Sequence, residues 1–434
     1  MVHVIPLENP LGPSAITIVF DDCPLPSKET VIKLTRLLGL SKLRAETGEL
    51  NIRVERNICI VLGCIADKLA GPNSVAVLTE DTLDYMLTFL ILRRQPFVVL
   101  FALIALEKFA HTTENKLTIK KRLDKEAENP LLVLEKLADS DDCVWRQVGF
   151  CAKWALDNIF VVDDRKLSYE IVDMSRINAI LNSHDVSEYL KISCDGLEAR
   201  CDSYSFESVR CTFQVNSGCW YYECLIVTPG VMQIGWATKN SHFLNHDGYG
   251  IGDDLYSLSY DGCRKLIWHQ AKPSPVTEVP IWKPGDIVGC LIDMEKREAI
   301  FSLNGHRMTP CTEIFQTTRQ GFFAAASFMA FQQCRFNFGY EPFRHPPKDR
   351  TFTVFNDFGY LTDEEKKVVP RRIYLEQLMS SSLQEDCCTL CFDDVACFVL
   401  EPCLHRGFCS LCTAQLKECP MCRAPIMNVR REDT

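Results

Sequence analysis

Cysteine and histidine residues near the C-terminus occur in closely spaced pairs, which is a pattern typical of metal binding. Thiolates and imidazole are the donors that zinc prefers, and two residues between paired cysteines let a tight turn bring both sulfurs to one ion. Eight such donors in register predict two tetrahedral zinc sites with no open position. The donors are Cys388 and Cys391, Cys403 and His405, Cys409 and Cys412, and Cys419 and Cys422.

Closed coordination predicts a structural metal. The segment is too small to form a core of its own, so loss of zinc is expected to unfold it. Cys387 and Cys397 are spare cysteines, and moving the ligand role from Cys388 to Cys387 would spoil the two-residue spacing. A zinc ribbon or another treble-type finger fits less well, because interleaved pairs with one histidine in fourth place indicate a cross-brace.

The segment from Cys387 to Arg423 resembles the RING finger family at all eight donors. It is most similar to the compact class found at the C-terminus of inhibitor-of-apoptosis proteins, which shares the Pro-Cys-x-His-x3-Cys run. The resemblance implies that one zinc is held by the first and third pairs of donors, and the other by the second and fourth. These sets are Cys388, Cys391, Cys409 and Cys412, and then Cys403, His405, Cys419 and Cys422.

The same resemblance implies a ubiquitin ligase that acts by positioning. Leu390 and Pro420 match the residues that contact the ubiquitin-conjugating enzyme, and Arg423 matches the linchpin arginine that donates hydrogen bonds to that enzyme and to ubiquitin. Holding both in one pose orients the thioester for lysine attack, with no ubiquitin carried covalently on the RING. The alternative for Arg423 is an ordinary solvated surface arginine.

A second set of motifs lies upstream, where short β-rich runs are broken by Gly, Asn and Asp, as in an all-β sandwich. Asn304-Gly305 predicts a hairpin turn with positive φ, and Trp220, Trp236 and Trp282 are expected in the core. The order and spacing of the runs resemble the whole SPRY domain family. The runs begin at Gly218, Gln233, Gly250, Ser257, Trp282, Ile300 and Phe336.

The SPRY resemblance implies binding of a peptide from a substrate that the sequence does not identify, through loops at one end of the sandwich. The candidate loops are Lys239–Tyr249 and Gln270–Glu278. For either one, an ordinary solvated loop is an equal alternative.

The elements before the sandwich are predicted to be helical from about Lys28 to Val162. Three segments look alike, each an apolar helix with a polar step near its end: Ile58–Ala70, Val98–Ala110 and Gln147–Phe160. Their offsets suit armadillo or HEAT repeats, and a plain helical bundle is the alternative.

The predicted protein is multidomain, with an all-α N-terminal region, a central all-β SPRY sandwich and a small zinc-bound RING finger. A capping box at Thr362–Glu365 is expected to start a helix that runs to about Ser380, with Pro370 as a bend or an end. The predicted ranges are an irregular segment 1–27, a helical repeat-like domain and connector 28–195, the SPRY domain 196–345, a linker and helix 346–386, the RING finger 387–425 and a tail 426–434.

Charge and composition narrow the classes of partner and compartment. A net charge of −10 argues against binding nucleic acid or an anionic membrane. The apolar run Phe97–Leu106 is too short to span a bilayer, and the start of the chain lacks the pattern of a signal peptide. Lone cysteines such as Cys151 and Cys194 are expected to be buried, reduced thiols. We therefore expect a cytoplasmic protein.

The order of helical region, SPRY domain and terminal RING resembles the RING finger and SPRY domain-containing protein 1 family. It implies a ubiquitin ligase whose SPRY domain selects the substrate while the RING recruits the charged conjugating enzyme, and the helix before the RING is a candidate for pairing two copies. A non-catalytic adaptor or scaffold is the alternative. A chromatin factor that reads nucleic acid through its zinc module is disfavoured by the acidic balance and the closed sites.

Overall fold

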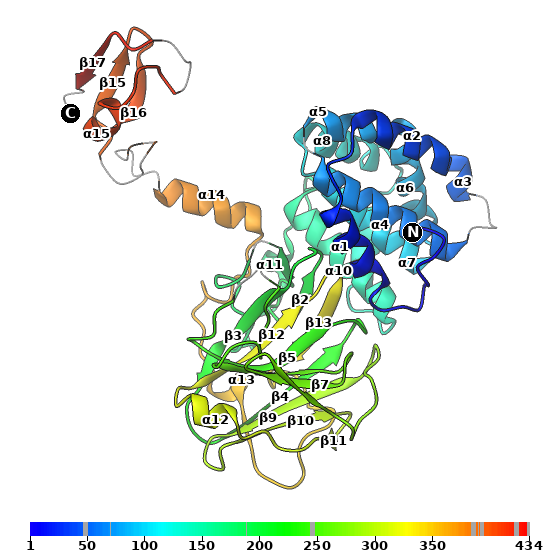
Figure 1. Cartoon of the computed structure of the whole chain (residues 1–434), viewed down its shortest axis with the longest axis vertical. Helices are drawn as coiled ribbons and strands as arrows, with labels where there is room; N and C mark the ends of the chain where they lie inside the picture. Colours follow the sequence, from blue (N-terminus) through cyan, green and yellow to red (C-terminus); the bar gives the residue numbers. More distant parts are fainter. Residues whose placement is uncertain are drawn as a thin grey trace. The chain divides into compact units, whose positions relative to one another are not determined.

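The computed structural model separates the chain into two compact units, Met1–Val368 (unit 1) and Val369–Thr434 (unit 2), and each is described by itself. Figure 1 shows helices followed by a β-sandwich in unit 1, and a small sheet in unit 2. The structure describes residues 1–46, 51–69, 71–187, 189–243, 248–382, 388, 390, 395–420 and 425–431.

The N-terminal half of unit 1 is helical, as predicted. Side-chain caps begin several of the helices: the Asn51 side chain accepts from the backbone N–H of Val54 at 3.3 Å, and Asp142 accepts from those of Val144 and Trp145 at 2.8 and 3.0 Å. The helices are α1 Gly12–Asp22, α2 Lys28–Leu38, α3 Lys42–Glu46, α4 Ile52–Lys68, α5 Pro72–Val77, α6 Glu80–Leu92, α7 Pro96–Phe109, α8 Thr113–Leu123, α9 Pro130–Leu134, the 3-10 turn Glu135–Leu137, α10 Cys143–Asn158 and α11 Ser168–Ile171.

The three look-alike segments form helices α4, α7 and α10, and α7 packs against both of the others. Every residue of α7 from Val98 to Phe109 is buried, because neighbouring helices and the sandwich together cover it. Its long apolar run, which is too short for a membrane span, is thus the centre of a helical core. No described helix combines the length and apolar character needed to cross a membrane.

The prediction that residues 1–27 are irregular is wrong, because α1 occupies Gly12–Asp22. Pro13 stands in the first turn of this helix, where its missing N–H is not needed for an intrahelical hydrogen bond. Pro10 and Pro24 lie on either side of the helix, and Pro13 lies within it. Ile16 is fully buried, and the Ser14 hydroxyl donates to the backbone carbonyl of Ala330 at 2.9 Å.

Unit 1 continues as a sandwich of two mainly antiparallel β-sheets. One sheet has the order β1-β2-β13-β4-β9-β10-β11, with β14 beside β4, and the other has the order β3-β12-β5-β6-β7-β8. The strands are β1 Leu190–Ile192, β2 Glu198–Cys201, β3 Glu207–Val215, β4 Cys219–Ile226, β5 Met232–Thr238, β6 Ser257–Asp261, β7 Leu266–His269, β8 Lys272–Pro275, β9 Ile287–Asp293, β10 Glu298–Leu303, β11 His306–Arg307, β12 Phe322–Phe328, β13 Gln332–Asn337 and β14 Thr353–Val354.

The sandwich core contains the predicted aromatic residues. Trp220, Trp236 and Trp282 are all buried. The rings of Tyr222 on β4 and Trp236 on β5 meet between the two sheets, with their centroids 5.1 Å apart. The predicted hairpin turn joins β10 to β11, with Asn304 at φ 49° and Gly305 at φ 82°. The all-β prediction for this region is confirmed.

The sandwich extends beyond the range 196–345 at both ends. Strand β1 at Leu190–Ile192 pairs with β2, and Thr353 and Val354 of β14 pair in parallel with Trp220 and Tyr221. Both strands are too short to show an alternating pattern, so the sequence could not distinguish them from loop. Two short helices, α12 Ile314–Thr317 and α13 Phe355–Phe358, complete this region.

Unit 2 contains a helix and a small three-stranded sheet of order β16-β15-β17. The capping hydrogen bonds between Thr362 and Glu365 are present in unit 1, but they close only a turn. The helix expected from that point begins after Pro370, as α14, because proline favours an extended conformation in the residue before it. The elements of unit 2 are α14 Arg371–Ser382, β15 Phe398–Glu401, β16 His405–Phe408, α15 Ser410–Thr413 and β17 Asn428–Arg431.

Candidate metal centre

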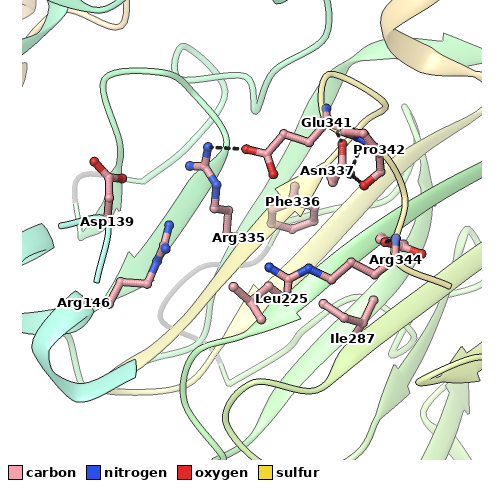
Figure 2. Close-up of a pocket in the computed structure, with 11 residues that line it drawn as sticks. Asp139, Arg146, Leu225, Ile287, Arg335, Phe336, Asn337, Glu341, Pro342 and Arg344 are labelled. Atoms are coloured by element: carbon pink, nitrogen blue, oxygen red, sulfur yellow. Dashed lines mark hydrogen bonds and ion pairs between the residues drawn. The ribbon is translucent and has the colours of Figure 1, made fainter. Parts of the chain in front are cut away.

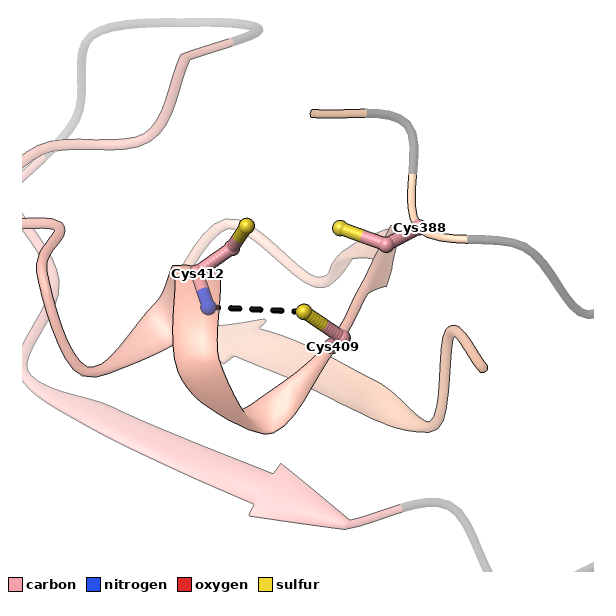
Figure 3. A group of neighbouring side chains, drawn as sticks. All are labelled: Cys388, Cys409 and Cys412. Atoms are coloured by element: carbon pink, nitrogen blue, oxygen red, sulfur yellow. Dashed lines mark hydrogen bonds between the residues drawn. The ribbon is translucent and has the colours of Figure 1, made fainter. Parts of the chain in front are cut away.

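The first candidate metal centre is built around the short helix α15. Cys409 precedes this helix as its N-cap, and its sulfur accepts from the backbone N–H of Cys412 at 3.4 Å. Cys388 is fully buried, and its sulfur lies within 4.8 Å of those of Cys409 and Cys412. Figure 3 shows the three sulfur atoms turned toward one another. Cys388 thus lies beside this pair, whereas Cys387 lies outside the described residues.

The second candidate centre lies at the turn between β15 and β16. Cys403 is in the turn and His405 is the first residue of β16, while Cys419 comes from beyond α15. The Cys419 sulfur lies 3.5 Å from Nδ1 of His405, and the three donor atoms are within 4.8 Å of one another. The turn is tight, with Leu404 at φ 59°.

Both triplets have a spacing that suits zinc. A tetrahedral ion with bonds of about 2.3 Å to sulfur separates two sulfurs by about 3.8 Å. The donor types and the separations therefore fit one ion in each place. Each triplet joins residues from alternating pairs along the chain, which is the interleaving predicted from the sequence. The predicted fourth donors, Cys391 and Cys422, lie outside the described residues.

The apolar core around these centres is very small. In the described part of the segment its buried members are Leu400, Phe408 and Cys419, one of which is itself a predicted ligand. A cluster of this size cannot stabilise a fold by burial alone. Cys397, in contrast, belongs to neither triplet and stands at the edge of β16, where its backbone N–H donates to the Phe408 carbonyl at 3.1 Å.

The predicted enzyme-contact residues are only partly described. Leu390 has 42% of its surface exposed, and Pro420 is also exposed. Both are thus accessible to another protein. Arg423 lies outside the described residues.

The lone cysteines of unit 1 are poorly suited to nucleophilic chemistry. Burial raises the pKa of the Cys151 thiol to about 12. Burial, with Asp195 nearby, raises that of Cys194 to about 11. A thiol is reactive as its thiolate, so these two residues are inert near neutral pH.

The two loops proposed for peptide binding differ in structure. Gln270–Glu278 was expected to be a loop, but it contains the exposed edge strand β8, whose Pro273 and Pro275 are tolerated at a sheet edge. The other segment, Lys239–Tyr249, is described only at 239–243 and 248–249.

Comparisons with known proteins identify both modules. Residues 219–341 match the SPRY domain family, and residues 384–429 match the family of C3HC4-type zinc fingers (RING fingers). Two solved structures are similar: the SPRY domain of human HERC1, with a TM-score of 0.31 and 17% identity over 36% of this chain and 96% of that one, and the TRIM65 PSpry domain, with a TM-score of 0.31 and 11% identity over 37% and 90%.

Curated relatives match parts of the chain. E3 ubiquitin-protein ligase RKP of Arabidopsis thaliana is 33% identical over 32% of this chain and 11% of its own length. ATP-dependent RNA helicase DDX1 of Xenopus laevis is 25% identical over 39% of this chain and 22% of its own length. The chain thus spans only about a tenth to a fifth of these relatives. It has a SPRY domain followed by a RING-type zinc finger, and one relative is named as an E3 ligase.

Proposed function

We propose that this chain is a RING-type E3 ubiquitin-protein ligase of the RING finger and SPRY domain-containing protein 1 family. The observation that carries the proposal is the pair of interleaved Cys/His triplets within a segment that matches the RING finger family. The distant resemblance to a curated E3 ligase supports it.

Two zinc ions would be held by the eight residues named from the sequence, and their chemistry is structural: they fix the fold of the segment. Cys388, Cys391, Cys409 and Cys412 would bind one ion. Cys403, His405, Cys419 and Cys422 would bind the other.

The chain's own residues then dock the ubiquitin-conjugating enzyme. Leu390 and Pro420 supply an exposed apolar contact, and Arg423 donates hydrogen bonds that hold ubiquitin against the enzyme. The acceleration comes from orientation, because the thioester is held in one pose for attack by a substrate lysine. Unit 1, which contains the sandwich, is the part that selects the substrate.

Discharge of ubiquitin from a loaded conjugating enzyme onto free lysine tests this function. The wild-type chain should accelerate discharge, and Arg423→Ala should lower the rate by about tenfold or more, equivalent to about 1.4 kcal/mol in the barrier. Arg431→Ala, an exposed arginine on β17, is the matched control and should keep the wild-type rate. No acceleration by the wild-type chain with any of a panel of conjugating enzymes would favour the adaptor or scaffold.

A further inference from the structure

One apolar cluster of the sandwich faces away from the sandwich core. Tyr221 on β4 pairs with Leu291 on β9, and Leu291 pairs with Ile300 on β10, so the three side chains share the outer face of the larger sheet. They form a buried cluster separate from the one between the sheets. Such an outer face needs a cover.

The cover is a strap, residues 341–352, that crosses this face. Its Phe343 and Phe352 rings lie 5.0 and 5.2 Å from the Tyr221 ring. The buried Glu223 carboxylate accepts hydrogen bonds from the backbone N–H groups of Arg344 at 2.8 Å and His345 at 2.7 Å. The strap is therefore held in a defined position by the sheet beneath it.

The strap leaves a hollow of about 460 Å³ between itself and the β10–β11 hairpin. Tyr221, Leu291 and Ile300 line it from the sheet, and Pro346 and Pro347 line it from the strap. A volume of this size is typical of small ligand pockets, in which an apolar surface is combined with a few polar groups.

Three cationic side chains, those of Arg307, Arg344 and Lys348, line the hollow. Arg307 pairs with Asp349 across it. Arg344 and Lys348 are both exposed, and neither side chain has a hydrogen-bond or ion-pair partner within the described parts of the chain. Although the chain as a whole has a net charge of −10, this hollow carries two unpaired cations.

Arg344 also borders a second hollow, of about 220 Å³, on the other side of the strap. Figure 2 shows its side chain extending there beside Leu225 and Ile287. The other two arginines in this hollow are already paired: Arg146 with Glu198 at 2.7 Å, and Arg335 with Asp195 at 2.7 Å. Arg344 is therefore the arginine left to bind an external anion among those that line the two hollows.

We propose that this face binds an acidic peptide segment of a partner protein, with an apolar side chain seated in the larger hollow against Pro346 and Pro347 and carboxylates on Arg344 and Lys348. This inference rests on the proposed function, because a protein that carries the bound segment would be a substrate of the ligase. Charge complementarity favours an acidic partner, and the mixed apolar and cationic lining favours a peptide over nucleic acid, since the hollow presents few cations.

Selection from a phage library of random dodecapeptides on the full chain tests the proposal. Peptides with Asp or Glu around one apolar residue should be enriched. Their affinity should fall at least about tenfold in the double variant Arg344→Glu, Lys348→Glu, and also on raising the salt from about 0.05 to about 0.5 M. The matched control Lys28→Glu, Lys33→Glu makes the same charge change on exposed residues of α2 and should bind as the wild type does.

Three results would overturn the proposal: enrichment of neutral or basic peptides or of none, unchanged affinity in the double variant, or tighter binding of single-stranded oligouridine than of the acidic peptides. The ubiquitin discharge assay on the same double variant separates the two hypotheses. It should retain the wild-type discharge rate on free lysine, because the RING is unchanged, so loss of peptide binding and loss of ligase activity are observed independently.

Discussion

A buried lysine joins the helices to the sandwich within unit 1. Lys191 on β1 is 4% exposed, and its Nζ lies 2.6 Å from Oε1 of Glu107 on α7 and 2.7 Å from Oδ2 of Asp202. Asp202 also pairs with Nε of Arg200 at 2.7 Å. Removing one member of such a buried group leaves other charges without compensation, which costs far more than losing a surface ion pair.

The ionisation of this group is set by its partners. Burial alone would lower the pKa of Lys191, but Asp202 and Glu107 outweigh burial and raise it. Burial alone would raise the pKa of Asp202, but Arg200 and Lys191 outweigh burial and lower it. The stabilisation from Lys191 is therefore complete below its unfolded pKa of about 10.4 and is lost as the pH rises through its folded pKa. The stabilisation from Asp202 is present above its unfolded pKa of about 3.9 and is lost as the pH falls through its folded pKa.

Replacing Lys191 with Met should destabilise unit 1 by about 3–5 kcal/mol near pH 7, because Glu107 is left buried without its cation. The deficit should narrow as the pH falls through the folded pKa of Asp202, because the stabilisation that its charge provides in the wild type is then lost. Urea unfolding of wild type and variant at pH 7 and pH 3 measures this. Lys166→Met, at an exposed position, is the control and should change stability little. An equal loss of stability at pH 7 and at pH 3 would contradict the charges assigned to this buried group.

Predicted metal donors and buried ion pairs differ in how well the sequence reveals them. The zinc donors stand two to a few residues apart, so local spacing was enough to identify Cys409 and Cys412 as a pair. Lys191 and Glu107, in contrast, are 84 residues apart, and either alone resembles an ordinary surface charge. Contacts of this range depend on the packing of α7 against the sandwich, which no local pattern encodes.

At the scale of elements, helix α10 is important because it contacts both α7 and the sandwich. It begins at the Asp142 cap, and from it Arg146 reaches Glu198 on β2 at 2.7 Å. The cap satisfies two backbone N–H groups that have no partner inside the helix. Its contribution should therefore be measurable in the stability of unit 1.

The variant Asp142→Ala should destabilise unit 1 by about 1 kcal/mol. The neighbouring Asp141→Ala removes an equally exposed carboxylate that caps nothing among the described residues, so it controls for the change in net charge. Chemical unfolding of both variants distinguishes the cap from the charge. Equal losses in the two variants would show that the hydrogen bonds to Val144 and Trp145 contribute nothing.

Element prediction succeeded where a long pattern existed and failed where one residue type had two roles. The helices around α7 and the strands of the sandwich follow from extended apolar periodicity. Residues 1–27 are predicted to be irregular, but Pro13 stands in the first turn of α1, where proline is favoured. Thr362 and Glu365 form the predicted capping pair, yet Pro370 delays the helix to Arg371.

For the whole molecule, the helices and the sandwich of unit 1 share one core. Ala330 and Phe331, at the β12–β13 turn, belong to the buried cluster of the helical region, and the Phe331 ring lies 5.1 Å from that of Phe101 on α7. Separate helical and SPRY domains were predicted from the change in pattern near residue 195, but pattern cannot show that two regions bury surface on each other. Binding experiments therefore need unit 1 as a whole.

Unit 2 should respond to metal removal independently of unit 1. Among the residues that the structure describes, its sheet has a core of three buried residues, one of them the predicted ligand Cys419, so the predicted zinc ions are expected to supply most of its stability. Unit 1 has large apolar clusters of its own and none of the predicted ligands. Chelation should therefore make the amide hydrogens of β15–β17 exchange rapidly with solvent. The amide hydrogens of α7 and of the sandwich strands should keep their slow exchange.

Cysteine substitution sharpens this test, because the segment offers a matched pair. Cys409→Ser removes a buried predicted ligand, so bound zinc should fall from about two ions per chain toward one, with loss of exchange protection in β15–β17. Cys397→Ser changes a half-buried cysteine that belongs to neither described triplet, so zinc content and protection should stay as in the wild type. Elemental analysis and hydrogen exchange on both variants test these expectations. Equal loss of zinc in the two variants would refute the assignment of Cys409 as a ligand. Changes in the hydrogen exchange of unit 1 would refute the independence of the two units.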